Sequence, residues 1–394
     1  MNISLKKDEK LLYLLRELYR QYGYRSFRMS KFEKYELYAG NKDFLVSDRV
    51  ITFTDTNGEL LALKPDVTLS IIRNASFAPG RKQKLYYQEN VYRPGGSSHQ
   101  FREIMQSGLE CIGDLDSYDV YEVLYLAAKS LKEISEQSVL SVSHLGILSS
   151  LAEAIGAEEE DQKLLLHLAA ARNSHELTEL FRNRGWDEAL LEELKELLRL
   201  NCTMKALPDL LRESTSGWIE ESVLKELKEL SELSGEQDAL MRFDLSVIND
   251  THYYNGIVFQ GFVQGISEKV ISGGRYDNLA EYYTDRRLPG VGISIGLTRL
   301  FYVLQEQGLL SDEVLTAPCD VLVIPMTEDL GPAISAATAF RNSELRAQLY
   351  TEKRKFKAKM SYADKIGAPF AVLLGEDEIE KGLLSLKNMQ IGRA

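Results

Sequence analysis

The sequence has few cysteines and no arrangement of them that suggests a bridge or a metal. Only three occur in 394 residues, without CxxC spacing or a flanking histidine cluster: Cys111, Cys202 and Cys319. These cysteines therefore indicate neither a disulfide framework nor a zinc site. We expect each cysteine to be a small buried apolar residue, and we predict that the protein needs no metal or other cofactor.

Long apolar runs are also missing. A membrane-spanning helix would need about 18 consecutive uncharged apolar residues, and the sequence contains no such stretch. The first ten residues, MNISLKKDEK, carry charges where a secretory signal would have its apolar segment. We therefore expect a cytoplasmic protein that does not associate with membranes.

Positive charge is in deficit. The chain has 47 Lys and Arg against 59 Asp and Glu, which gives a net charge of −12 and a pI near 5.2. Broad attachment to nucleic acid depends on clustered Lys and Arg, so nucleic acid is not an expected partner. The apolar content of 44% can supply the cores of two or three ordinary globular domains.

Strand and helix patterns alternate in blocks along the chain. Apolar residues recur at helical spacing in Glu9–Tyr22, and two hairpins follow. The first turns at Asn57-Gly58, a dipeptide suited to positive φ, and the second joins Lys84–Arg93 to Arg102–Gly113. A largely helical block at about 150–235 then interrupts the strands, which resume as RFDLSVINDTHYYNGIVFQGFV and KVISGGRYDNL. We therefore expect a core domain over residues 1–312 with a helical insertion.

A second, smaller domain is expected after Pro318. From there CDVLVIP, a helix from about Gly331, QLY, a helix around Lys357–Ile366 and FAVLLG alternate as βαβαβ. This alternation is typical of an α/β unit, which we place at residues 318–394.

Polar residues on two predicted strands suggest a small-molecule cavity. Gln106, Gly108 and Glu110 share one strand face by the period of two, and Gly108 would leave room for a ligand. Asp66 and Thr68, read as the end of another strand, would share a face and could bind an α-ammonium group. The alternative for the first group is an edge strand with a solvated face.

Taken in order, several segments resemble the catalytic core of histidyl-tRNA synthetases and their paralogues. They are YGYRSF, FEKYELYAG, ITFTDTNGELLALKPDVT, REIMQSGLECIGD, HYYNGIVFQGF, SGGRYDNL and GVGISIGLTRL. FKAKMSYADKIGAPFAVLLGEDEIEKG resembles that family's anticodon-binding domain. The resemblance covers nearly the whole chain and implies an α+β fold: a class II synthetase-like antiparallel sheet core with a helical insertion, followed by a small α/β domain.

The resemblance also implies a histidine pocket. Three residues would meet the α-ammonium side of the ligand: Asp66, Thr68 and Gln106. Glu110 and Tyr254 would address the imidazole nitrogens, and Tyr276 would close the site. A buried carboxylate beside a ring N–H favours an imidazole and fixes its tautomer.

The chain departs from the synthetase pattern where ATP activation needs a cation. The family places an arginine in an R-G-[LF]-D-Y-Y segment, and here Asn249 and Asp250 occupy the aligned N-D-T-H-Y-Y. Transition-state charge at the α-phosphate would lose a donor. Arg93, Arg102 and Arg299 are retained as possible nucleotide or phosphate contacts.

The segments LKPDVT and HYYNGIVFQGF are similar to those of the regulatory subunit of ATP phosphoribosyltransferase, a synthetase paralogue. This similarity implies a non-catalytic protein that binds L-histidine, forms a homodimer within a hetero-oligomer and confers feedback on a short-form catalytic subunit in histidine biosynthesis. The alternatives are an active histidyl-tRNA synthetase and another amino-acid-dependent ligase.

Overall fold

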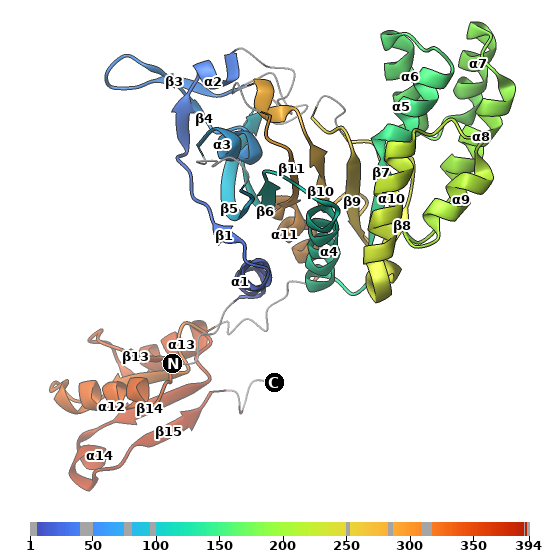
Figure 1. Cartoon of the computed structure of the whole chain (residues 1–394). Coiled ribbons are helices and arrows are strands. Elements are labelled where there is room, and N and C mark those ends of the chain that lie inside the picture. The colour runs from blue at the N-terminus through green and yellow to red at the C-terminus, as the bar shows by residue number, and fades with distance from the viewer. Residues whose placement is uncertain are drawn as a thin grey trace. The chain divides into compact units, whose positions relative to one another are not determined.

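The computed structural model describes residues 6–39, 50–74, 81–94, 100–249, 253–282, 287–308, 317–389 and 391. The chain divides into two compact units (Figure 1). The larger comprises Lys10–Glu306, and the smaller comprises Gln307–Ala394 together with Met1–Glu9. Among the described residues, no helix is both long and apolar enough to cross a membrane.

The larger unit is built on an eight-stranded sheet. In spatial order its strands are β1 (Arg25–Ser26), β5 (Gln83–Pro94), β6 (Phe101–Ile112), β11 (Gly290–Gly296), β10 (Ile271–Tyr276), β9 (Ile257–Val263), β7 (Ser138–His144) and β8 (Met241–Phe243). The outermost pairs, β1–β5 and β7–β8, are parallel, and every pairing between them is antiparallel. The predicted α+β core is confirmed, as is the hairpin of β5 and β6.

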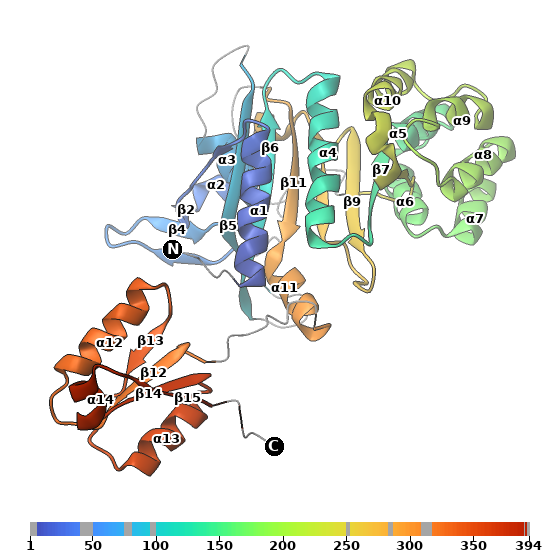
Figure 2. The same ribbon diagram turned by 90° about the horizontal axis from the view of Figure 1, so that it is seen from below.

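Two helices cover one face of this sheet, α1 (Lys7–Gln21) and α4 (Ser117–Ile134), as Figure 2 shows. The Tyr19 hydroxyl lies 3.1 Å from Ser130 Oγ and joins the two helices. The Gln88 side chain donates from β5 to the Leu12 carbonyl at 2.7 Å. The apolar stripe predicted for the first helix is buried here, so the site must use the opposite face of the sheet.

On that opposite face lie a small three-stranded sheet and two short helices. The elements are β2 (Phe32–Lys34), α2 (Glu36–Ala39), β3 (Thr52–Thr54), β4 (Leu60–Leu63) and α3 (Val67–Asn74). β3 and β4 form the predicted hairpin, and Gly58 has φ +84° in its turn, where glycine carries no Cβ penalty. Residues of α3 share an apolar core with residues of β5, which fixes the helix over the sheet.

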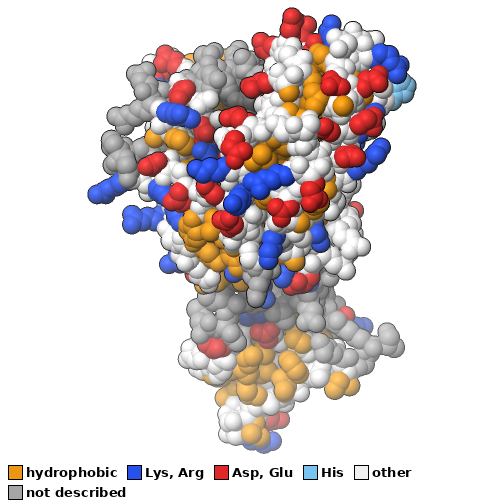
Figure 3. Space-filling model, turned by 45° about the vertical axis from the view of Figure 1, so that its right-hand side comes forward, with side chains coloured by type: hydrophobic (Ala, Val, Ile, Leu, Met, Phe, Trp, Pro, Cys, Tyr) orange, Lys and Arg blue, Asp and Glu red, His pale blue; other side chains and the backbone are white. Residues whose placement is uncertain are grey.

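A run of helices follows β7 before the chain returns to the sheet at β8. They are α5 (Leu145–Ala154), α6 (Glu159–Ala170), α7 (Ser174–Arg184), α8 (Glu188–Arg199), α9 (Leu207–Ser214) and α10 (Glu221–Ser234). Each has an apolar stripe of buried leucines, as the period of 3.6 residues requires. On the molecular face shown in Figure 3, acidic and basic side chains are interspersed.

A polar network ties this helical block to the central sheet. Glu226 on α10 lies 3.3 Å from both His144 Nε2 and Arg275 Nη1. The Gly146 N–H donates to His144 Nδ1 at 3.0 Å, which leaves Nε2 directed at Glu226. Burial alone would raise the pKa of Glu226, but His144 and Arg275 outweigh it and hold that pKa below its ordinary value.

Glu226→Gln is expected to lower the free energy of unfolding by about 1 to 3 kcal/mol near neutral pH, because Arg275 loses a charged partner. A depressed carboxyl pKa contributes stability above its unfolded value, and that contribution is lost as pH falls through the folded value. The deficit of the variant should therefore shrink in acid. Urea unfolding against pH tests this, with the exposed Glu232→Gln on the same helix as control. An equal deficit at every pH would contradict the charge-based explanation.

The smaller unit is a four-stranded sheet in the order β13, β12, β14, β15. Its elements are β12 (Val321–Pro325), α12 (Gly331–Asn342), β13 (Ala347–Leu349), α13 (Phe356–Lys365), β14 (Phe370–Leu374), α14 (Glu376–Lys381) and β15 (Ser385–Asn388). The predicted βαβαβ order is confirmed. The last helix and the antiparallel edge strand were not predicted. All three cysteines are buried and free, as expected.

Candidate functional site

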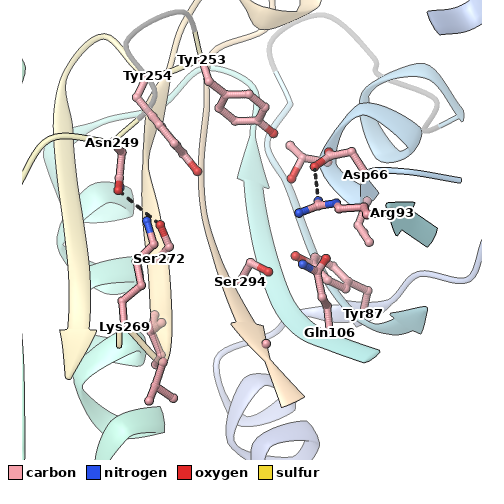
Figure 4. A pocket seen from close by; sticks show the side chains of 15 residues that line it. Asp66, Tyr87, Arg93, Gln106, Asn249, Tyr253, Tyr254, Lys269, Ser272 and Ser294 are labelled. Carbon is pink, nitrogen blue, oxygen red and sulfur yellow. Dashed lines mark hydrogen bonds and ion pairs between the residues drawn. The ribbon is translucent and has the colours of Figure 1, made fainter. Parts of the chain in front are cut away.

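A cavity of about 480 Å³ opens on the sheet face opposite α1 and α4. Its floor is formed by side chains of β5, β6, β10 and β11, and its walls come from the start of α3 and from the segment before β9. Figure 4 shows the polar side chains that converge on it. The site is therefore assembled from segments far apart in the sequence.

Asp66 and Thr68 both line this cavity, but the strand predicted for them is wrong. β4 ends at Leu63 and α3 begins at Val67, so Asp66 is the helix N-cap and accepts from the Leu69 N–H at 3.0 Å. Pro65 lacks an N–H and an Asp follows it, which favours a helix start over a continuing strand.

Glu110 lies beneath the cavity and is only 2% exposed. The Thr68 hydroxyl donates to Glu110 Oε1 at 2.5 Å, and the Tyr276 hydroxyl donates to Oε2 at 2.8 Å. Opposite on β11, Gly292 leaves the space that this carboxyl group fills, since a Cβ there would lie 1.9 Å from Glu110 Oε2. Thr68 is thus the link between the cavity surface and the buried acid.

Tyr276, predicted to close the site, is 1% exposed and lies below the cavity beside Glu110. Gly108, predicted to leave room for a ligand, instead makes room for Tyr87, whose hydroxyl would be 2.4 Å from a Cβ at that position. Gln106 and Tyr254 do line the cavity. Period-two reasoning found the face of the strand correctly, but it could not tell which side chains a neighbouring strand would cover.

Burial raises the pKa of Glu110 to about 8, and the nearby Asp66 charge adds to the effect, although hydrogen bonds from Thr68 and Tyr276 oppose it. The protonated form of this carboxyl group is therefore favoured at neutral pH. A protonated carboxyl group can donate as well as accept, so the acid can adapt to either tautomer of a ring placed above it.

Glu110→Gln is expected to flatten the pH dependence of stability. Between the ordinary pKa of 4.5 and the folded value of about 8, the folded state holds a proton that the unfolded state has released. The free energy of unfolding of the wild type therefore falls as pH rises through this window, by up to about 1.4 kcal/mol per pH unit from this group. Urea unfolding at about pH 6 and about pH 8 measures the slope. Identical slopes for variant and wild type would contradict the shift.

The three arginines proposed for nucleotide contacts do not converge. Arg93 lines the cavity, but its Nη2 lies 3.3 Å from Asp66 Oδ2 and its Nε donates to the Pro65 carbonyl at 2.7 Å. Arg102 is exposed on β6 and is not part of the cavity wall. Arg299 is exposed on α11 (Leu297–Glu306) and forms an ion pair with Glu268.

Asn249 occupies the cavity wall with its amide fully engaged. Nδ2 donates to the Gly273 carbonyl at 2.8 Å and to the Phe259 carbonyl at 3.3 Å, while Oδ1 accepts from Gln260 Nε2 at 2.8 Å. The residue is 6% exposed. Its uncharged side chain therefore connects β9 to β10 through hydrogen bonds. Asp250 lies outside the described residues.

Sequence reasoning missed several lining residues that the fold supplies. They are Tyr87, Tyr253, Lys269, Ser272 and Ser294. The alternation of Tyr86 and Tyr87 across β5 could have indicated Tyr87, because one of them must face each side of the sheet. Lys269 lies in the connection between β9 and β10, where the sequence shows no periodic pattern to use.

This fold and this cavity define a class II synthetase-like protein. Residues 3–300 match the histidyl-tRNA synthetase family, and residues 320–393 match the anticodon binding domain. Since the first match spans most of the chain, the protein belongs to the histidyl-tRNA synthetase family.

Relatives and solved structures agree with this membership. The histidine–tRNA ligase of Clostridium tetani is 30% identical over 96% of this chain and 89% of its own. That of Thermococcus kodakarensis is 28% identical over 96% of this chain and 89% of its own. The histidyl-tRNA synthetase of Nostoc sp. is similar in structure, with a TM-score of 0.78, 21% identity and coverage of 99% of this chain and 94% of that one.

A second structural neighbour carries a double description. It is an ATP phosphoribosyltransferase regulatory subunit/histidyl-tRNA synthetase from Bacillus halodurans. The TM-score is 0.76 at 21% identity, with 95% of this chain and 96% of that chain covered. At this identity the likeness shows the fold alone.

Proposed function

We propose that this protein is a regulatory subunit of ATP phosphoribosyltransferase that binds L-histidine and does not activate it. The observation that carries the proposal is the residue at position 249. Asn249 aligns with the arginine that the family uses in catalysis, but it is neutral and buried, and its amide has four hydrogen-bond partners. Loss of one donor at a developing charge costs roughly 3 to 4 kcal/mol, or two to three orders of magnitude in rate.

The cavity chemistry suits histidine. Asp66, Thr68 and Gln106 line one end and supply a carboxylate, a hydroxyl and an amide for the α-ammonium group. Tyr254 lines the wall above, and Glu110 lies beneath Thr68 as an acid that can lose its proton when an imidazole approaches. A ligand without ring nitrogens would leave these polar groups unpaired, which supplies the discrimination.

Regulation requires unequal affinity. Histidine must bind the inhibited state of the complex with the short-form catalytic subunit more tightly than the active state, and a coupling of about 1 to 3 kcal/mol changes the populations roughly 5- to 150-fold. The chain is expected to act as a homodimer within this hetero-oligomer.

Reconstitution with the short-form catalytic subunit tests the proposal. The subunit is expected to have low activity alone, to gain activity when this protein is added, and to be inhibited by histidine only in the mixture. Glu110→Ala should retain activation but need more histidine for inhibition. No effect of this protein on the activity of the subunit would contradict the proposal.

The second candidate is an active histidine–tRNA ligase. The curated relatives at 30% and 28% identity carry that name, and residues 320–393 match an anticodon binding domain. Aminoacylation of histidine tRNA distinguishes the candidates: the ligase must form histidyl-tRNA with ATP, whereas the regulatory subunit must not. Genuine turnover in that assay would favour the ligase.

A further inference from the structure

Lys269 brings a positive charge into the cavity wall. It lies in the connection between β9 and β10 and lines the cavity together with Asn249 and Ser272. Figure 4 shows its side chain extending along the wall toward these two residues, on the side of the cavity away from Asp66. Within the described parts of the chain, its ammonium group has no hydrogen-bond or ion-pair partner.

The other cation that lines the cavity is already paired. Arg93 Nη2 lies 3.3 Å from Asp66 Oδ2 and its Nε donates to the Pro65 carbonyl, so this guanidinium group has partners within the protein. Glu268, the neighbour of Lys269 in sequence, forms its ion pair with Arg299 instead. Lys269 is exposed over part of its surface, and partial burial lowers its pKa. A partly desolvated ammonium group is stabilised by an anion placed beside it, and the protein does not supply one among the residues described.

We propose that Lys269 binds the carboxylate of the amino acid held in this cavity. The inference rests on the proposed binding of histidine and assigns the group that recognises its acid end. A zwitterionic amino acid carries an ammonium group and a carboxylate group on the same α-carbon, and the cavity offers Asp66 and Gln106 on one side and Lys269 on the other. The lysine thus supplies a carboxylate contact that the neutral Asn249 cannot.

Titration calorimetry with two ligands tests the assignment. Histidine carries the carboxylate, and histamine is the same molecule without it. Lys269→Met is expected to weaken histidine binding roughly 5- to 50-fold, the loss of one charge-assisted contact, and to leave histamine binding within about 2-fold. Lys269→Arg should retain most of the histidine affinity because it keeps the charge.

The outcomes separate this inference from the function on which it rests. Equal weakening of both ligands by Lys269→Met, or no weakening of histidine, would overturn the role of Lys269 while histidine binding by the wild type stands. If the wild-type protein binds no histidine, the proposed function fails and this inference fails with it. Lys132→Met, exposed on α4 and outside the cavity wall, is the matched control and should bind both ligands as the wild type does.

Discussion

Replacement of Glu110 by alanine is expected to weaken histidine binding by about 1.5 to 3 kcal/mol, or roughly 10- to 150-fold. Two effects add. The ligand loses the acid that would pair with its ring, and the hydroxyls of Thr68 and Tyr276 lose the acceptor that orients them. Thr68 lines the cavity, so its reorientation reaches the ligand directly. Isothermal titration calorimetry measures the change.

Glu110→Ala removes both the volume of the side chain and its carboxyl group, and the two effects must be separated because Glu110 is packed against Gly292. Glu110→Gln keeps the volume and one acceptor, so it should fold well and lose less affinity than alanine does. Near-ultraviolet circular dichroism confirms the fold of each variant before titration. Unaltered affinity in a folded Glu110→Ala protein would mean that the ligand is elsewhere.

Glu89→Ala is expected to lower the free energy of unfolding by about 3 to 5 kcal/mol. Lys64 is completely buried, and its Nζ lies 2.9 Å from Glu89 Oε2. Removal of the carboxylate leaves a buried ammonium group without its counter-charge, which is among the most costly single changes. Lys64 directly precedes Pro65 and Asp66, so histidine binding should weaken as well. Urea unfolding gives the magnitude.

Two controls identify the cause of that loss. Lys34 and Glu59 form an ion pair 2.5 Å apart with side chains 58% and 38% exposed, so Glu59→Ala should cost no more than about 1 kcal/mol. In Glu89→Leu combined with Lys64→Met, both charges are absent, and most of the stability should return. If the double variant is as unstable as Glu89→Ala, the buried charge is not the reason.

The fold could be predicted largely because its local signals are strong. Asn57-Gly58 specified a hairpin, the leucine pattern of the first helix specified its buried face, and the βαβαβ alternation after Pro318 specified the smaller unit. Elements without such patterns were missed. β15 is a four-residue edge strand with the sequence SLKN, whose pairing with β14 depends on tertiary contact and not on propensity.

The site could be predicted only in part, for a physical reason. Residue type indicated Asp66 and Thr68, strand period indicated Gln106, and the family resemblance indicated Tyr254; all four line the cavity. The depth of a side chain depends on what the neighbouring strand allows. Glycines on β11 admit the carboxyl group of Glu110 and the ring of Tyr276 into the layer beneath the cavity. Period-two arguments on one strand contain no information about that neighbour.

The arginines show the same limit of sequence-based prediction, in this case for charged side chains. Arg93 and Arg299 could be named from the sequence, but ion pairing with Asp66 and Glu268 occupies them. These partners come from other elements of the fold, so no local pattern could reveal them. The sequence indicated which residues could carry a positive charge, and the fold determined which of them remain available to a ligand.

Pyrophosphate exchange on a preparation with measured histidine affinity tests the central claim most directly. The account predicts that histidine binds and that exchange dependent on histidine and ATP stays at background, because Asn249 provides no cation at the α-phosphate. An active histidyl-tRNA synthetase assayed in parallel is the positive control for the exchange rate. Robust exchange by this protein, abolished by Glu110→Ala, would contradict the account and establish an active ligase.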